Sequence, residues 1–82
     1  MSIETVRKEV ESEIRLLEEF RNELKWLDRG LKGERGKGVD PKTIRDRALR
    51  ALESLKDPKF RPLLERYGIA LPKPEEIARH YG

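Results

Sequence analysis

The feature that most constrains this chain is a heptad repeat of apolar residues near the start of the sequence. With Ile3 at position a, eight of the nine a and d positions up to residue 31 are apolar, and Glu13 is the exception. No Gly or Pro occurs before Gly30, which predicts one amphipathic helix over about residues 3–29. Such a helix is about 40 Å long, whereas a compact chain of 82 residues has a diameter of about 30 Å. The helix is therefore longer than the domain that its own chain can build around it.

The apolar stripe on this helix is wider than the seam of a two-stranded coiled coil. Ile14 and Leu16 extend it on both sides, and a broad stripe is typical of a helix that meets two neighbours in a bundle. In a parallel two-stranded coil Glu23 would face Asp28 of the other strand, which sets like charges together. Trp26 lies off the seam, where it either packs against a second helix or anchors a partner.

Start signals divide the rest of the chain into shorter helices. Asp40-Pro41 and Asp57-Pro58 each place a capping carboxylate before a proline at the first helical position. A further helix begins at Pro74, after an extended stretch that prolines keep out of the helical conformation. We therefore expect helices over about residues 41–56, 58–67 and 74–81.

Four glycines within nine residues mark the connector between the long helix and the helix that follows it. Because glycine disfavours regular structure, we expect residues 30–39 to form a flexible loop rich in Gly, Lys and Arg. Gly30 is expected at C′, the position that ends the first helix. Together these elements predict a single all-α domain over residues 1–82, a small bundle in which the long helix packs antiparallel against the second helix and two short ones.

Composition excludes several kinds of chemistry. The chain has no Cys, and its one His, His80, lies two residues from the C-terminus, so we expect neither thiol chemistry, nor a Ser/His/Asp triad, nor a metal centre with three or four ligands. We expect no enzyme activity, no cofactor, no metal and no small-molecule substrate. No apolar run is long enough to span a membrane, and the first residues lack the pattern of a signal peptide, so we expect a cytoplasmic protein. Depletion of Cys, Gln and Asn beside 43% charged residues is typical of a thermophilic source.

Charge is distributed unevenly along the chain. Residues 1–28 carry a net charge of −3, residues 29–50 carry +5, and residues 51–82 carry +1. Either the acidic and basic helices neutralise each other, or the basic segment faces a polyanion. Since no aromatic residue lies within 29–50, that segment offers only non-specific contacts with nucleic-acid phosphates. The basic side chains available for such contacts are Arg29, Lys32, Arg35, Lys37, Lys42, Arg45, Arg47 and Arg50.

The function that the sequence favours is association without catalysis. About 20 large apolar side chains give a chain of this size only marginal stability unless further surface is covered, and oligomerisation is the route open to it. We expect self-association, most simply as a homodimer, or binding of a partner protein. The alternative is non-specific nucleic-acid binding by residues 29–50. The association is expected to use the heptad face of the first helix, at Val10, Leu17, Phe20, Leu24 and Leu27.

Overall fold

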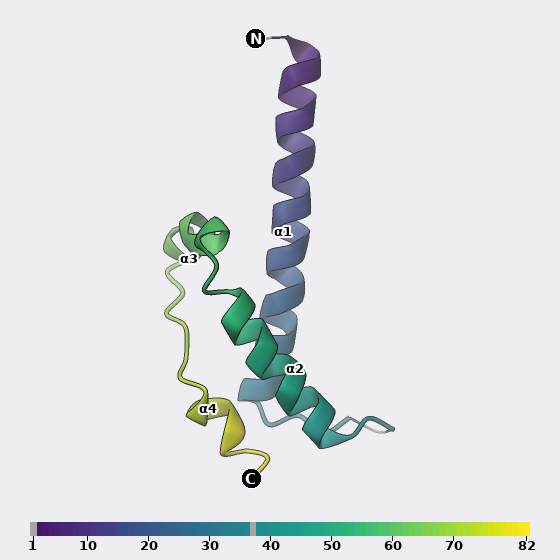
Figure 1. Ribbon diagram of the computed structural model, residues 1–82, viewed down its shortest axis with the longest axis vertical. Coiled ribbons are helices and arrows are strands. Elements are labelled where there is room, and N and C mark those ends of the chain that lie inside the picture. The colour runs from purple at the N-terminus through teal and green to yellow at the C-terminus, as the bar shows by residue number, and fades with distance from the viewer. Residues whose placement is uncertain (1, 37) are drawn as a thin grey trace.

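The computed structural model describes residues 2–36 and 38–82, and within these residues it contains helices and turns but no strand. The predicted all-α fold is therefore confirmed. The long helix α1 is followed by four shorter elements, of which η1 is a single 3-10 turn (Figure 1). The elements are α1 (Ile3–Leu31), α2 (Pro41–Ser54), η1 (Pro58–Phe60), α3 (Arg61–Arg66) and α4 (Glu75–Ala78).

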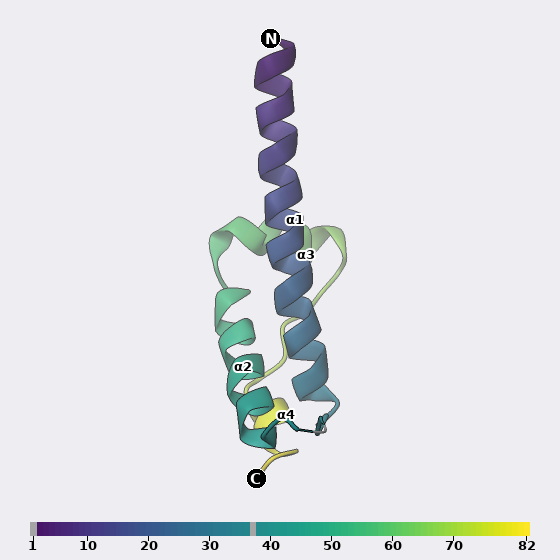
Figure 2. The same cartoon turned by 90° about the vertical axis from the view of Figure 1, so that its right-hand side faces the viewer.

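The molecule is an elongated bundle with one protruding helix. Helix α2 packs antiparallel against the C-terminal half of α1, as predicted, while α3 and α4 lie on one side of that pair (Figures 1 and 2). The N-terminal half of α1 stands clear of the other helices in both views. The resulting extents are 53 × 27 × 16 Å. No helix within the described residues is both long enough and apolar enough to cross a membrane.

Local capping chemistry sets where α1 begins. The Ser2 hydroxyl accepts a hydrogen bond from the backbone N–H of Thr5 at 3.1 Å, so it satisfies one of the free N–H groups of the first turn. Asp40 caps α2 in the same way through the N–H of Lys42, at 3.0 Å. The predicted starts of both helices are thereby confirmed.

The end of α1 differs from the prediction. The helix continues through Gly30 to Leu31, and the left-handed C′ position belongs instead to Gly33, whose φ is +64°. The N–H of Glu34 bonds to the carbonyl of Arg29 at 3.0 Å, and the N–H of Gly33 bonds to that of Gly30 at 3.1 Å. These two bonds form a Schellman motif, so the prediction that Gly30 ends the helix is wrong.

Gly30 has a packing role where α1, α2 and α4 meet. A Cβ atom added to Gly30 would lie 2.3 Å from the Cβ of Ala48 and 3.1 Å from Cγ2 of Ile77. Only a residue without a side chain permits this approach, and it brings α2 and α4 directly onto the backbone of α1. A sequence reading of Gly30 as a helix terminator misses this role because the contact is tertiary.

The core lies between the C-terminal half of α1 and the rest of the chain. The rings of Phe20 in α1 and Phe60 in η1 lie 5.7 Å apart, at the end of the bundle where η1 follows α2. Ile77 of α4 is fully buried, which confirms the expectation that the last helix packs against the bundle. The main cluster consists of Phe20, Leu27, Ala48, Ala51, Leu52, Leu55, Phe60, Leu63 and Ile77.

The shorter helices differ from their predicted lengths. Helix α2 ends at Ser54 rather than residue 56, and the predicted helix over 58–67 is divided into η1 and α3. Helix α4 covers only four of the eight residues expected over 74–81, and turns follow it. Gly68, with φ +60°, closes α3 by a second Schellman motif, in which the N–H of Ile69 reaches the carbonyl of Leu64 at 2.9 Å.

The expected flexible connector is shortened and partly anchored. Helix α1 takes up its first two residues, and the C-terminal turn holds two of the next ones. The Tyr81 hydroxyl donates to the carbonyl of Glu34 at 2.7 Å, and the Arg35 guanidinium donates to the carbonyl of His80 at 3.0 Å. Lys37 lies outside the described residues.

Candidate interaction surface

An apolar stripe runs along the N-terminal half of α1 without cover from the chain. We call it the N-terminal stripe. Every residue from Ile3 to Arg15 is exposed, although the apolar residues of this segment continue the heptad spacing of the buried half. The stripe consists of Ile3, Val6, Val10 and Ile14, which are 88%, 44%, 48% and 49% exposed.

The stripe is uncovered because the helices that build the core are too short to reach it. Helix α2 has 14 residues and α1 has 29, so α2 spans about 21 Å of a rod about 43 Å long. Beyond α2, η1 places Phe60 against Phe20, and the bundle ends at this level (Figure 1). The apolar spacing of α1 therefore extends about 20 Å past its own core.

A shallow apolar groove prolongs the stripe toward the C-terminal half of α1. Its walls are α1 and the segment after α3, where the half-exposed ring of Tyr67 lies 6.4 Å from the ring of Phe20. A depression that includes Ile14 adjoins it and shares Leu17 and Arg21 with it. Stripe and groove thus form one apolar face along most of α1. The groove is lined by Leu17, Phe20, Arg21, Leu24, Tyr67 and Ile69.

The structure divides the five residues expected to form a protein interface. Phe20 and Leu27 are 4% exposed and belong to the core, because α2, η1 and α3 cover that part of the seam. They are therefore not free to contact a partner. Leu17 and Leu24 are half-buried and line the groove, and Val10 is exposed on the N-terminal stripe.

Several residues of this face were missing from the expected interface. Ile3 and Val6 occupy the same seam, and comparing the lengths of the first two helices would have marked them as uncovered. Tyr67 and Ile69 carry no sequence signal of this kind, because only the fold brings the segment after α3 beside α1.

Ion pairs engage half of the basic side chains proposed for nucleic-acid binding. Arg47 of α2 reaches Glu23 of α1 with two hydrogen bonds, of 2.6 and 3.1 Å, at a largely buried position. Within the described residues this is the one ion pair that joins α2 to α1. The other pairs are Arg29–Glu34 at 3.2 Å, Lys32–Asp28 at 2.9 Å and Arg45–Asp46 at 3.0 Å.

The Arg47–Glu23 pair shifts the titration of both groups. The hydrogen bonds from the Arg47 guanidinium hold the pKa of Glu23 below its usual range, against the opposing effect of burial. The same bonds raise the pKa of Arg47. The pair therefore stays ionised across the neutral range and ties α2 to α1.

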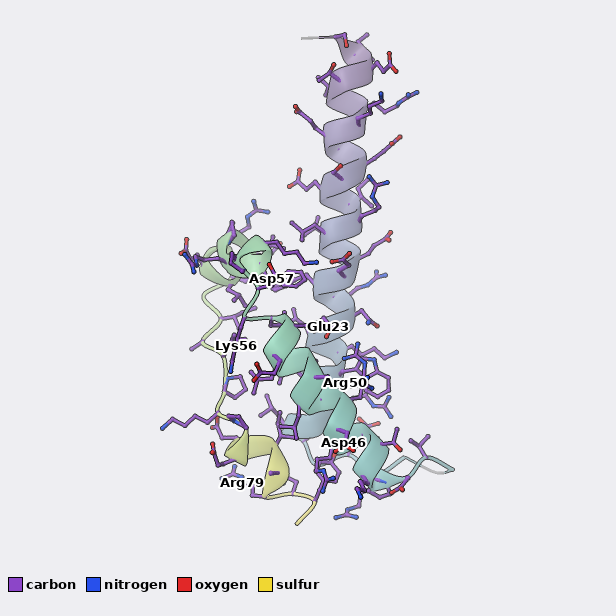
Figure 3. The ribbon with its side chains drawn as sticks, in the orientation of Figure 1. Glu23, Asp46, Arg50, Lys56, Asp57 and Arg79 are labelled. Atoms are coloured by element: carbon purple, nitrogen blue, oxygen red, sulfur yellow. The ribbon has the colours of Figure 1, made fainter. Side chains whose placement is uncertain are left out.

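The structure supplies an aromatic side chain that the basic segment itself lacks. Trp26 of α1 is half-buried, with the guanidinium groups of Arg29 and Arg47 at 4.6 and 5.5 Å from the ring centroid. Figure 3 shows Arg50 on α2 near Glu23, at the junction of the two helices. Arg50 and Lys42 are exposed, and neither has an ion pair within the described residues.

No feature of a metal centre accompanies these surfaces: the described part of the chain contains no group of three or more potential metal-binding side chains. Comparisons with protein-family models, with curated proteins and with solved structures found no match for this chain.

Proposed function

We propose that this protein is a non-enzymatic interaction protein that self-associates through the apolar face of α1. The observation that carries the proposal is the N-terminal stripe, four apolar side chains in heptad spacing on a helix that its own chain leaves uncovered. Contiguous exposed apolar surface on a small protein is typical of an interaction site. The neighbouring groove offers more surface of the same kind.

The size of the stripe indicates how much more surface association requires. Full burial of a Val or Ile side chain is worth about 1.5–3 kcal/mol, so covering the exposed part of each, which is larger for Ile3 than for the other three, contributes on average about 1 kcal/mol. Four side chains on each of two copies then supply about 8 kcal/mol, whereas association itself costs about 4–15 kcal/mol. The stripe alone therefore supports weak association, and a stable complex has to use the groove as well.

One substitution on the stripe tests the proposal directly. Ile14→Lys places a charge in the middle of the apolar face, and Ser12→Lys places the same charge on the opposite side of the same exposed helical turns. We expect light scattering to show a dimer for the native chain and for Ser12→Lys, and a monomer for Ile14→Lys. Circular dichroism controls for helix content. Equal masses for the two variants, monomeric or dimeric, would contradict the proposal.

Nucleic-acid binding is the second candidate function. It is supported by the cluster of Trp26, Arg29 and Arg47 with the exposed Arg50, because cationic side chains beside an aromatic ring suit single-stranded nucleic acid. The ion pairs to Glu23 and to Glu34 weaken this candidate. A titration of single-stranded DNA and RNA at several salt concentrations decides it, since phosphate contacts require an affinity that falls steeply with salt.

A further inference from the structure

We infer that the occupant of the groove is a second copy of this chain, with the two α1 helices antiparallel. This inference rests on the proposed self-association and specifies its geometry. The N-terminal stripe of each copy lies in the groove of the other, so that one symmetric contact covers both apolar surfaces. The polar residues that interrupt the apolar face of α1 determine this orientation.

One face of α1 carries the whole contact. Its residues are spaced by three or four, which keeps them on the same side of a helix with 3.6 residues per turn. The face begins with the N-terminal stripe and continues through the groove residues on α1, and only two of its members, Arg21 and Asp28, are polar. In order these residues are Ile3, Val6, Val10, Ile14, Leu17, Arg21, Leu24 and Asp28.

A parallel arrangement of two such faces brings like charges together. In register, Arg21 meets Arg21 of the second copy and Asp28 meets its own counterpart, which is unfavourable inside an apolar contact. A parallel contact limited to residues 3–17 avoids both clashes but is only about 21 Å long. It would also leave the groove beside Tyr67 open.

An antiparallel arrangement removes both conflicts. When the symmetry axis passes between residues 15 and 16, Val10 lies opposite Arg21 of the second copy and Ile14 lies opposite Leu17. Contact then extends over residues 3–28, about 38 Å, which nearly doubles the surface covered. The longer contact is needed because stable protein–protein interfaces bury about 800 Å² of surface on each partner.

Charge complementarity supports the same register. Val10 is flanked by Glu9, Glu11 and Glu13, so Arg21 of the second copy meets three carboxylates within one helical turn. Of these groups, Arg21, Glu9 and Glu13 form no ion pair within the described residues of a single copy. The arrangement also explains Glu13, the one polar residue at a seam position, as a partner for this arginine.

Tyr67 and Ile69 complete the site from outside α1. In the antiparallel register Val6 and Val10 of the second copy fall at the level of Leu24 and Arg21, beside the wall that Tyr67 and Ile69 form. The exposed ring of Tyr67 is then covered by the aliphatic side chains of the second copy. A parallel contact limited to residues 3–17 gives this ring no cover.

Disulfide trapping distinguishes the two orientations, since the chain has no cysteine of its own. Val10→Cys and Arg21→Cys are prepared separately, mixed, and oxidised under mild conditions. In the antiparallel dimer residues 10 and 21 of different copies are adjacent, whereas two copies of residue 10 lie about 16 Å apart along the axis. A disulfide requires Cα atoms within about 7 Å. The expected result is a cross-linked heterodimer in the mixture and little product from either variant alone.

The other outcomes separate the two proposals. Cross-linking of Val10→Cys with itself would overturn the antiparallel geometry and leave self-association in place. A native chain that scatters light as a monomer would overturn both proposals. A native dimer whose variants stay dimeric yet cross-link in neither combination would place the interface elsewhere and overturn both as well. As a second measurement, Arg21→Glu is expected to raise the dimer dissociation constant about tenfold. The symmetric dimer contains two contacts between Arg21 and the carboxylates around Val10, and the substitution removes both.

Discussion

Replacing Gly30 by alanine tests the packing on which the fold depends. Helical propensity alone favours alanine at this position by about 1 kcal/mol. The structure opposes that gain, because the new Cβ would lie 2.3 Å from the Cβ of Ala48 and 3.1 Å from Cγ2 of Ile77. Relief of the first contact requires α1 and α2 to separate by more than 1 Å, given an ordinary carbon–carbon contact of about 3.5–4.0 Å.

The expected magnitude follows from these opposing effects. Overpacking a well-packed core costs about 1–3 kcal/mol, occasionally more, and this contact is at the severe end of that range. After the gain in propensity, Gly30→Ala should lower the free energy of unfolding by about 1–2 kcal/mol. For a domain of this size the melting temperature then falls by about 4–16 °C.

The assay is urea and thermal denaturation followed by circular dichroism at one fixed protein concentration. Ser12→Ala serves as the control, because it changes helix propensity at an exposed position of the same helix. Adding Ala48→Gly to Gly30→Ala removes the opposing Cβ and should restore part of the loss, visible as a positive coupling in a double-mutant cycle. A Gly30→Ala variant more stable than the native chain would refute the close approach of α1 and α2.

Two further predictions concern the end of α1 and its pair with α2. Gly33→Ala should lower the free energy of unfolding by about 1–2 kcal/mol, because φ is +64° and the new Cβ would lie 2.8 Å from the Cβ of His80; unchanged urea unfolding would contradict the Schellman cap. The pKa of Glu23 is lower in the folded state than in the unfolded chain, so its pair with Arg47 stabilises the fold at pH values above the pKa of the unfolded carboxyl group. That contribution is lost as the pH falls through the lower pKa of the folded state. Glu23→Gln should therefore be less stable than the native chain at pH 7 and approach it at pH 3 in urea unfolding, and a constant difference would show that the ionised pair does not cause the effect.

Local chemistry made part of the fold predictable. Ser2, Asp40 and Gly68 each satisfy backbone groups within a few residues of themselves, so their positions in the sequence are sufficient to identify them as caps. Gly30 is different, because a glycine near the end of a helical pattern either terminates the helix or admits a neighbour. Ala48 decides between these roles, and it lies 18 residues away in another helix.

The candidate surface was predictable in outline but not in extent. The heptad spacing identified an apolar face with more surface than the short helices can cover, and the exposed side chain of Val10 lies on it. Which half of the face remains open depends on where α2 packs, so Phe20 and Leu27 were assigned to an interface although they belong to the core. The proximity of Trp26 to Arg47 likewise depends on how the two helices pack.

Sedimentation equilibrium of the native chain, from micromolar to millimolar concentration, tests most directly whether α1 is covered by a second copy. We predict that the mass rises with concentration from 9.6 kDa to twice that value and stays there. A mass of 9.6 kDa throughout the range would show that the exposed half of α1 remains uncovered in solution, and it would contradict the central claim.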